Sequence, residues 1–507
     1  MRRLVANRYV LALLVVIALA AEFGLASLSR HPAALAAGPQ TPAPARATVS
    51  AALRACPAPG SAGATASGLA LAAASSGSGQ AQVTRLSPVG AATTPAPLHV
   101  LTQPGLLSLV NVATAPPLSR GLAQETAGPS VPTSPERGGV MISATGSMAR
   151  GLEVEQTSAG GLATAPCLGP GTDFWFVGPG QKSSAEIELY LMNTDGQAAD
   201  ASVQVLTDSG PVLGSTDAGI GVPPHGMVVQ SLAGLVRGSH DVALNVTTSV
   251  GRVVAAVLET SGPGQPGAWL PAAEPPANTQ VLPGLPGTPG GRELYVAVPG
   301  SANAQIKVTA ITAKGSYQPT GGSGLDLPGG SAISVALPSM GGIAAGVLVS
   351  SNVPVTASMS LSGGASGAPG AFTAAAAPVQ EQGVIAGNPG APGGGTSVLV
   401  LSAPKGAAQV QVTELTATGQ SAAGASAPRT VQLAAGHSVV LTLAAPRQGG
   451  RSSAFAVVIT PMAGSGPVYA GRVVTQAGVV RSILPVMSSL TWVPLPAVHS
   501  SVTTGLP

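Results

Sequence analysis

The chain has little of three residue classes on which many protein functions depend. Its 507 residues include only two cysteines, 3% aromatic residues and 8% charged residues. The 22 basic and 19 acidic residues give a net charge of +3 and are scattered along the sequence. A nucleic-acid-binding surface requires Lys and Arg gathered on one face or stripe. We therefore expect no nucleic-acid partner.

The sequence also lacks the motifs that mark common catalytic sites. It has no G-x-S-x-G turn for a hydrolase nucleophile, no H-E-x-x-H zinc motif and no Walker phosphate loop. The histidines are dispersed, at positions 31, 99, 225, 240, 437 and 499. Asp173, Glu186 and Glu188 come closest to forming a cluster of carboxylates. However, the two glutamates share one face of an expected strand and would repel each other. We predict no enzyme activity, no metal and no cofactor.

Only one long apolar run is present, Tyr9–Leu28, and three arginines precede it. A basic flank before an apolar run is typical of an export signal. Residues 1–28 are therefore predicted to be a signal peptide or, if uncut, a membrane anchor, because about 20 apolar residues can also span a bilayer. The Ala- and Pro-rich stretch 29–50 predicts a tether. The remainder is expected to be extracytoplasmic, either secreted or held on the outer face of the cytoplasmic membrane.

Export gives the two cysteines a specific meaning. In an oxidising compartment, two thiols and no others predict one disulfide, Cys56–Cys167. The long loop it closes would contribute about 4–5 kcal/mol in the chain-entropy model, as an upper figure. Two unrelated buried thiols are the alternative.

Short period-two patterns of apolar and β-branched residues fill the chain after residue 174, and they recur about every 105 residues. ELYLMN at Glu188–Asn193 matches ELYVAV at Glu293–Val298 and, more loosely, SVLVLS at Ser397–Ser402. The connectors match as well, since PGAW at Pro266–Trp269 corresponds to PGAF at Pro369–Phe372. The sequence thus predicts three tandem β repeats.

Five of the few aromatic residues are candidates for a packing or binding role, and most of these lie near a cysteine or a repeat boundary. Phe174, Trp175 and Phe176 follow Cys167 in the stretch DFWFVG, which aligns with the first strand of the later repeats. Two readings stay open for these three and for Trp269 and Trp492. They are packing residues at domain junctions, or they are stacking surfaces for a ligand.

The predicted architecture is all-β, and the repeats and the N-terminal pattern divide the chain into six parts. They are the signal or anchor 1–28, the tether 29–50, an N-terminal β domain 51–173 with a low-complexity insert, the repeats 174–280 and 281–383, and a repeat with a closing strand at 384–496. The strand count favours immunoglobulin-like sandwiches, and Gly- and Pro-rich connectors such as Gly284–Gly291 favour sandwiches that can be separated. The alternative is a multi-bladed β-propeller.

Four stretches resemble a known family. They are ACP at Ala55–Pro57, GSMARGLEVEQ at Gly146–Gln156, APC with DFWFVG within Ala165–Gly178, and a turn ending in VPPHG. Together they are similar to an actinobacterial secreted protein family of unknown function, DUF5719. The resemblance implies export, a cell-envelope setting and no known catalytic residues.

These observations favour a non-catalytic exported scaffold or interaction protein of the cell envelope. Its expected partners are the membrane, through the N-terminal segment, and an envelope protein or glycan. A protein that binds cell-wall polysaccharide is the main alternative, and it would need exposed tryptophans. A divergent hydrolase is a further alternative, and it would need paired carboxylates across a cleft.

Overall fold

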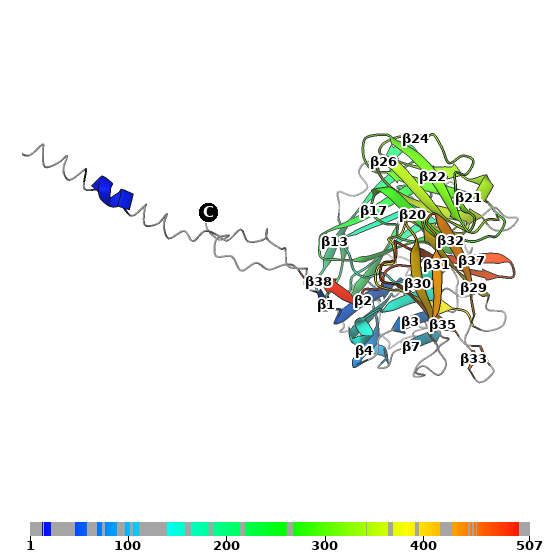
Figure 1. Cartoon of the computed structure of the whole chain (residues 1–507), viewed down its shortest axis with the longest axis horizontal. Coiled ribbons are helices and arrows are strands. Elements are labelled where there is room, and N and C mark those ends of the chain that lie inside the picture. The colour runs from blue at the N-terminus through cyan, green and yellow to red at the C-terminus, as the bar shows by residue number, and fades with distance from the viewer. Residues whose placement is uncertain are drawn as a thin grey trace, which may run out of the picture. The chain divides into compact units, whose positions relative to one another are not determined.

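The structure is a computed structural model of the chain (Figure 1). It describes residues 13, 15–21, 46–57, 68–73, 77–88, 97–101, 105–110, 139–157, 164–181, 186–212, 219–260, 267–340, 342–362, 369–390, 395–415, 428–444, 447–448, 451–452 and 454–495. Within these ranges the elements are strands, apart from helical residues at 13 and 15–21 and short 3-10 turns at Ser147–Ala149 and Pro338–Met340. The predicted all-β class is confirmed.

The chain divides into two compact units, residues 1–47 with 493–507 and residues 48–492. Most of the predicted export segment 1–28 and of the tether 29–50 lies outside the described residues. Strand β1 (Arg46–Thr48) pairs with β38 (Trp492–Pro494). In the part of the chain that is described, no helix combines the length and apolar character needed to cross a bilayer.

Residues 51–166, the first segment, form two antiparallel four-stranded sheets. In spatial order, one sheet is β2 (Ala51–Cys56), β8 (Val140–Gly146), β4 (Gly79–Arg85) and β6 (Pro97–Leu101). The other is β10 (Thr164–Pro166), β9 (Glu153–Thr157), β3 (Gly68–Ala73) and β7 (Gly105–Val110). Counted along the segment, without the short β5, the orders are 1-6-3-4 and 8-7-2-5.

The second segment, residues 173–270, repeats this order. One sheet is β11 (Asp173–Pro179), β17 (Asp241–Val250) and β13 (Ala199–Thr207), with β14 (Gly210–Pro211) and β15 (Ile220–Val222) on the edge of β13. The other is β19 (Gly267–Leu270), β18 (Val254–Thr260), β12 (Glu186–Met192) and β16 (Gly226–Ser231). The outer edge of β16 pairs with β5 (Ser87–Pro88), so the first segment extends a sheet of the second.

In the third segment, residues 277–374, one strand serves both sheets. The strand β26 (Ala345–Ser362) pairs through its first half with β20 (Ala277–Leu285) and β22 (Ala304–Thr312), and through its second half with β21 (Arg292–Val298) and β27 (Pro369–Ala374). The edges are completed by β23 (Gly315–Tyr317), β24 (Leu325–Leu327) and β25 (Ser331–Ala336). The strand order is again the same.

The fourth segment, residues 383–485, has the same two sheets. They are β28 (Gly383–Asn388), β35 (Phe455–Pro461), β30 (Ala408–Leu415) and β31 (Arg429–Leu433), and β37 (Val479–Pro485), β36 (Tyr469–Gln476), β29 (Thr396–Ala403) and β32 (His437–Leu443). A small hairpin joins β33 (Arg447–Gln448) and β34 (Arg451–Ser452). Among the described strands, all four segments therefore share one topology, including the first, which the sequence had not grouped with the repeats.

This strand order confirms neither of the two predicted architectures, the immunoglobulin-like sandwich and the β-propeller. In the immunoglobulin fold, strands A, B, E and D form one sheet and C, F and G the other, so the first strand lies with the second and the seventh with the third and sixth. Here the first strand pairs with the sixth, and the seventh pairs with the second. The immunoglobulin connectivity is therefore not confirmed. A propeller is not confirmed either, because each four-stranded sheet draws its strands from across its segment rather than from consecutive strands.

Each segment has an apolar core between its two sheets, built from the period-two alternation of its strands. In β22, Ile306 and Val308 are buried while Gln305 and Lys307 are exposed. The cores do not stop at segment boundaries. The core of the second segment includes Tyr295 and Phe372 of the third, and the core of the third includes Val473 of the fourth.

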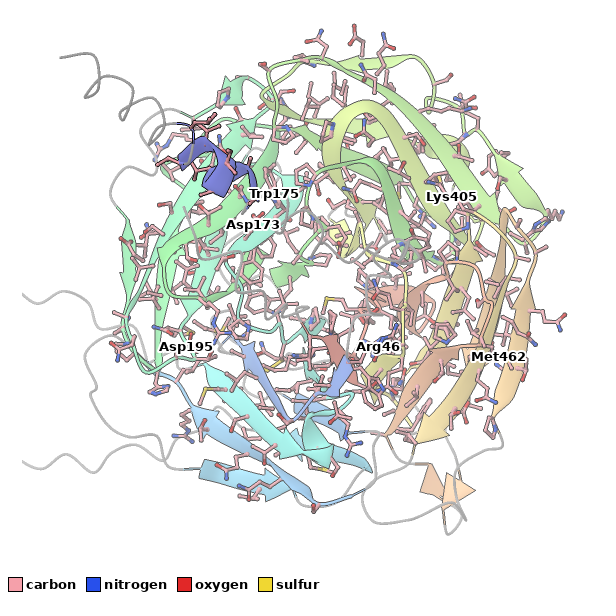
Figure 2. The ribbon with its side chains drawn as sticks, turned by 60° about the vertical axis from the view of Figure 1, so that its left-hand side comes forward. Arg46, Asp173, Trp175, Asp195, Lys405 and Met462 are labelled. Atoms are coloured by element: carbon pink, nitrogen blue, oxygen red, sulfur yellow. A yellow bond between two sulfur atoms is a disulfide. The ribbon has the colours of Figure 1, made fainter. Side chains whose placement is uncertain are left out.

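The segments contact one another in a closed circuit within residues 48–492. A shared apolar cluster joins the first segment to the second, and the fourth segment returns to the first where β28 packs on β9 and β3. At the centre of the circuit the last strands of the segments meet, β10 with β19, β19 with β27, β27 with β37, and β37 with β10. Figure 2 shows the sheets following one another around this centre. The closure between the fourth and first segments joins parts of the chain farthest apart in sequence.

Candidate functional site

The aromatic residues singled out in the sequence divide into a buried and an exposed group. Trp175 and Trp269 are 6% and 8% exposed, and Phe176 is 1% exposed. The indole of Trp269 packs edge-on against the ring of Tyr190, with centroids 5.3 Å apart, and Phe174 is half-buried against the same cluster. Trp492 on β38 is 45% exposed. Burial favours the packing interpretation for the aromatics near Cys167 and for Trp269.

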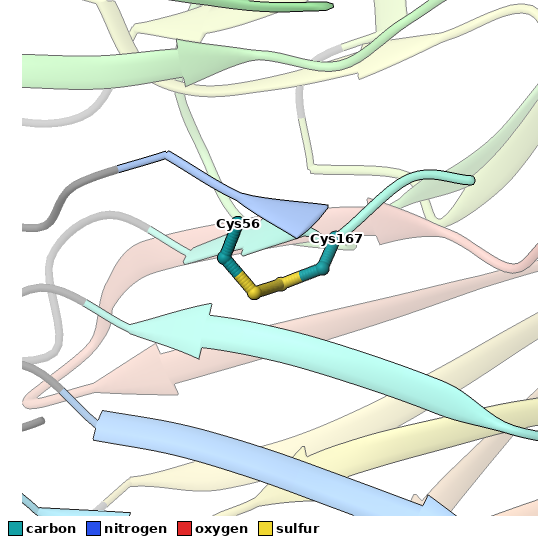
Figure 3. The surroundings of a disulfide bond; sticks show 2 residues. All are labelled: Cys56 and Cys167. Carbon is teal, nitrogen blue, oxygen red and sulfur yellow. A yellow bond between two sulfur atoms is a disulfide. The ribbon is translucent and has the colours of Figure 1, made fainter. Parts of the chain in front are cut away.

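The predicted disulfide is present and joins Cys56 at the end of β2 to Cys167, the residue after β10 (Figure 3). Both side chains are fully buried. Two backbone hydrogen bonds flank the bridge, from Cys167 N to Val154 O at 2.9 Å and from Ala55 N to Leu168 O at 2.9 Å. The bridge therefore ties β2 to the residue after β10, and that residue is hydrogen-bonded to β9, the strand that faces the fourth segment.

Residues Val486–Trp492, which we call the closing segment, follow β37 and run between the fourth and first segments. On one side, Ser489 N donates to Gln382 O at 2.7 Å, and Val486 N donates to Ala470 O at 2.8 Å. On the other side, Thr491 O accepts from Val49 N at 2.9 Å and Leu490 O accepts from Gly151 N at 3.4 Å. The closing segment thus connects the two ends of the circuit through its backbone.

The Glu381 carboxylate holds the end of the closing segment. Its Oε2 atom accepts hydrogen bonds from Thr491 N at 2.8 Å, from the Thr491 hydroxyl at 2.5 Å and from Trp492 N at 3.2 Å. Hydrogen bonds to an ionised acceptor are stronger than those between neutral groups. This single side chain therefore fixes the residues that lead into β38.

A buried carboxylate from the first segment holds the middle of the closing segment. Glu153 Oε1 accepts from the Ser489 hydroxyl at 3.0 Å and from Arg54 Nη2 at 3.2 Å. Glu153 is 5% exposed. Burial raises the pKa of the Glu153 carboxyl above its ordinary value, although Arg54 and Ser489 lower that pKa. The loss of water outweighs the favourable partners.

Glu155 lies two residues after Glu153 on β9 and joins the first segment to the fourth by a second buried contact. Glu155 Oε1 accepts from Ala386 N at 2.8 Å, and Glu155 Oε2 lies 3.1 Å from Arg472 Nη1. The same Arg472 nitrogen donates to Gly387 O. Arg472 is 1% exposed and Glu155 is 3% exposed. An ion pair this deeply buried depends on both partners, because either charge alone would be stranded away from water.

The other junctions are joined by different buried polar contacts. Ser358 Oγ donates to Val177 O at 2.5 Å between the third and second segments, and Ser438 Oγ donates to Ile311 O at 2.6 Å between the fourth and third. Asp241 Oδ2 accepts from Ser334 N on the edge strand β25 at 2.8 Å. Burial raises the pKa of Asp241. Among the described residues, the fourth-to-first closure is the junction bridged by an ion pair.

Sequence reasoning did not identify the closure residues. The stretch GLEVEQ carries no sign of a junction, because the alternation of Glu153, Val154 and Glu155 ordinarily marks a strand with one face in water. Glu381 and Arg472 stood in no recognised motif. In the structure, Asp173 lies on β11 and Glu186 and Glu188 on β12, so these three carboxylates come from different sheets of one segment. The described residues contain no group of three or more His, Cys, Asp or Glu side chains arranged to hold a metal ion.

The fold and this closure define an all-β protein of four two-sheet segments joined end to end. The chain belongs to the family of unknown function DUF5719, whose model matches residues 122–444. A comparison with curated proteins gave no match. The matched range covers part of the first segment, the second and third, and most of the fourth.

Replacement of Glu153 by Gln should alter the pH dependence of stability. Burial raises the pKa of Glu153 in the folded protein above its value in the unfolded chain. Between these two pKa values the folded protein binds more protons than the unfolded chain. The stability that the protonated group contributes is therefore lost as pH rises through the folded-state pKa. Glu153→Gln keeps a neutral hydrogen-bonding group. We expect it to equal or exceed the wild type in stability at neutral pH, and to lose that advantage at acidic pH.

Urea unfolding at a series of pH values measures this effect as a difference between wild type and Glu153→Gln. Asp241 and Glu274 also have raised pKa values, and the difference cancels their contributions. Asp241→Asn at another junction should change the pH dependence in the same direction, because burial also raises the pKa of Asp241. A wild type that gains stability over Glu153→Gln as pH rises would show that Arg54 and Ser489 outweigh the burial of the carboxylate.

Proposed function

We propose that the protein is a non-catalytic, exported protein of the cell envelope that acts as a rigid scaffold or interaction platform. The observation that carries the proposal is the placement of its scarce charged side chains. Although charged residues make up 8% of the chain, Glu153, Glu155, Arg292 and Arg472 are each at most 5% exposed. They contact backbone groups or other charges at junctions and connectors.

Arg292 illustrates the same use of charge inside a connector. Its guanidinium donates to the carbonyl oxygens of Pro286, Thr288, Gly290 and Gly291 at 2.7–3.2 Å. Burial lowers the pKa of this guanidinium. This Gly- and Pro-rich stretch, which joins β20 to β21 within the third segment, is thus held in place. The cores that neighbouring segments share support a platform whose segments keep one arrangement.

The disulfide supports the proposed location outside the cytoplasm. Disulfides form and persist in oxidising compartments and are rare in the cytosol, and Cys56–Cys167 is the bridge in this chain. We propose that residues 1–28 direct export and that the membrane is a partner through this segment, as a cleaved signal or as an anchor. The second proposed partner is an envelope protein.

Site-specific photocrosslinking in intact cells tests the proposal. A photoreactive residue would replace Val250, Ile343 or Met462, which are exposed apolar side chains at 59%, 38% and 37% exposure. The control position is Leu399, which is buried in the fourth segment. We expect position-dependent adducts with one or a few envelope proteins from the exposed sites and none from the control. Adducts that are equally spread over many proteins from every exposed position would contradict an interaction platform.

A cell-wall glycan as ligand is the alternative partner, and the exposure of Trp492 is the observation that favours it. Exposed tryptophans stack on sugar rings, and Trp492 is 45% exposed while the other two tryptophans are buried. Co-sedimentation of the purified protein with isolated cell walls distinguishes the alternatives. Loss of sedimentation in Trp492→Ala, with retention in Val440→Ala at a second exposed apolar site, would transfer the proposal to glycan binding.

A further inference from the structure

The disulfide and the closing segment are connected by a short series of contacts. Cys167 N bonds to Val154 O, and the residues on either side of Val154 are Glu153 and Glu155, which hold the closing segment and the fourth segment. On the other cysteine's strand, Arg54 stands two residues before Cys56 and donates to Glu153 Oε1. A change at either end therefore reaches the other through one strand, β9.

Apolar packing joins the same two features by a separate route. Ala55 and Leu168 are the neighbours of the two cysteines, and both belong to the buried cluster between the first and second segments. Met487 of the closing segment packs against this cluster. If the closing segment leaves its place, Met487 withdraws from the apolar surface beside the bridge.

Burial decides when a reductant can reach the bridge. Cys56 and Cys167 are both 0% exposed, so thiol–disulfide exchange, which needs direct attack on a sulfur atom, has to wait for a local opening. A dithiol reductant attacks one sulfur and its second thiol completes the exchange. It leaves as a cyclic disulfide, and its two thiol protons pass to Cys56 and Cys167.

We propose that the Cys56–Cys167 disulfide and the closing segment form one redox-sensitive closure of the circuit. Displacement of the closing segment is the opening that admits the reductant to the bridge. Reduction in turn frees β2 from Cys167 and so from its link to β9, weakens the Arg54–Glu153–Ser489 contacts and releases the closing segment. The bridge therefore controls more than the strands it joins, because it also holds the closing segment against the first segment.

The first experiment measures how fast a dithiol reduces the full-length oxidised protein under native conditions. Ser489→Ala removes the hydroxyl that binds Glu153, and Thr491→Val removes the hydroxyl that binds Glu381. We expect each to speed reduction by about tenfold to a hundredfold, the range for losing a hydrogen bond to a charged group. Ser438→Ala is the matched control, because it removes a buried serine hydrogen bond between the third and fourth segments. We expect its reduction rate to stay within about twofold of wild type, since substitutions at distant sites that share no partners act independently.

Two outcomes would overturn the proposal. Equal acceleration in Ser438→Ala and in the closing-segment variants would mean that reduction follows global unfolding. Unchanged rates in both Ser489→Ala and Thr491→Val would mean that the bridge opens without the closing segment. Far-ultraviolet circular dichroism verifies that each variant is folded, and two independent variants keep the test valid if one fails to fold.

The reverse coupling is tested by amide hydrogen exchange on Cys56→Ala/Cys167→Ala. We expect faster exchange in peptides from the closing segment and from residues 380–388, and unchanged exchange in β26 of the third segment. An effect confined to residues 51–57 and 164–168 would show that the bridge acts only on its own strands and would overturn the proposal.

Discussion

A fragment of residues 277–374, the third segment alone, is expected to be molten or insoluble rather than a folded domain. Its side chains complete the cores of both neighbours, since Tyr295 and Phe372 are 4% and 3% exposed within the core of the second segment. On its other face, Leu282 and Val347 share a core with Val473 of the fourth segment. Excision would expose both surfaces to water. Exposed apolar patches and unpaired strand edges favour aggregation.

Size-exclusion chromatography and thermal unfolding of the fragment measure this outcome. The control is the full-length protein, in which the same residues keep both neighbours. A monomeric fragment with a cooperative melt would contradict the expectation and would show that the two-sheet core of one segment suffices. The Gly- and Pro-rich stretch Gly284–Gly291 favoured separable sandwiches at the level of the sequence, but in the structure it joins β20 to β21 within the third segment and marks no boundary between segments.

Replacement of Arg472 by Met is expected to cost about 3–5 kcal/mol in the free energy of unfolding, the range for breaking a buried ion pair from one side. The substitution leaves Glu155 buried at 3% exposure without its cation and leaves Gly387 O without its donor. The double variant Glu155→Met/Arg472→Met removes both charges. Because apolar replacement of a whole buried pair is often nearly neutral, we expect the double variant to recover much of the loss.

Urea unfolding of the two single variants and the double variant gives the coupling between the residues as a double-mutant cycle. Arg292→Met is the matched control, because Arg292 is equally buried but donates to carbonyl oxygens rather than to a carboxylate. It should show no recovery when combined with Glu155→Met. Additive effects of Glu155→Met and Arg472→Met would mean that the pair contributes no more than its separate packing.

The strands were predictable because their alternation is local. Ile306 and Val308 alternate with Gln305 and Lys307, and the period alone indicates a strand with one buried face. The disulfide was predictable for a different reason, since two cysteines in an exported chain leave one intramolecular pairing. The four-segment topology was not predictable, because which strands pair across a segment depends on long-range contacts. The Ala- and Ser-rich composition also hid the first segment's likeness to the others.

The closure residues escaped prediction for a related reason. Glu153 and Glu155 occupy the face of β9 that a local pattern assigns to water, but the closing segment reaches Glu153 and β28 reaches Glu155, so both are buried. Arg472 is a lone charge within an apolar strand, and its partner lies in another segment. Charge at a junction has no sequence signal when its partners are hundreds of residues away. The family match adds the relationship but assigns these residues no role.

The Ser489–Glu153 hydrogen bond also sets an order in time, because its partners are 336 residues apart in the sequence. At the ribosomal rate of roughly 5–20 residues per second, the second partner follows the first by roughly 17–67 seconds. Throughout that interval the outer face of β9 lacks its final cover, whatever the rest of the chain has formed. The first segment to be synthesised is therefore the last to be completed, and until then two carboxylates on β9 face water and keep that unfinished surface polar.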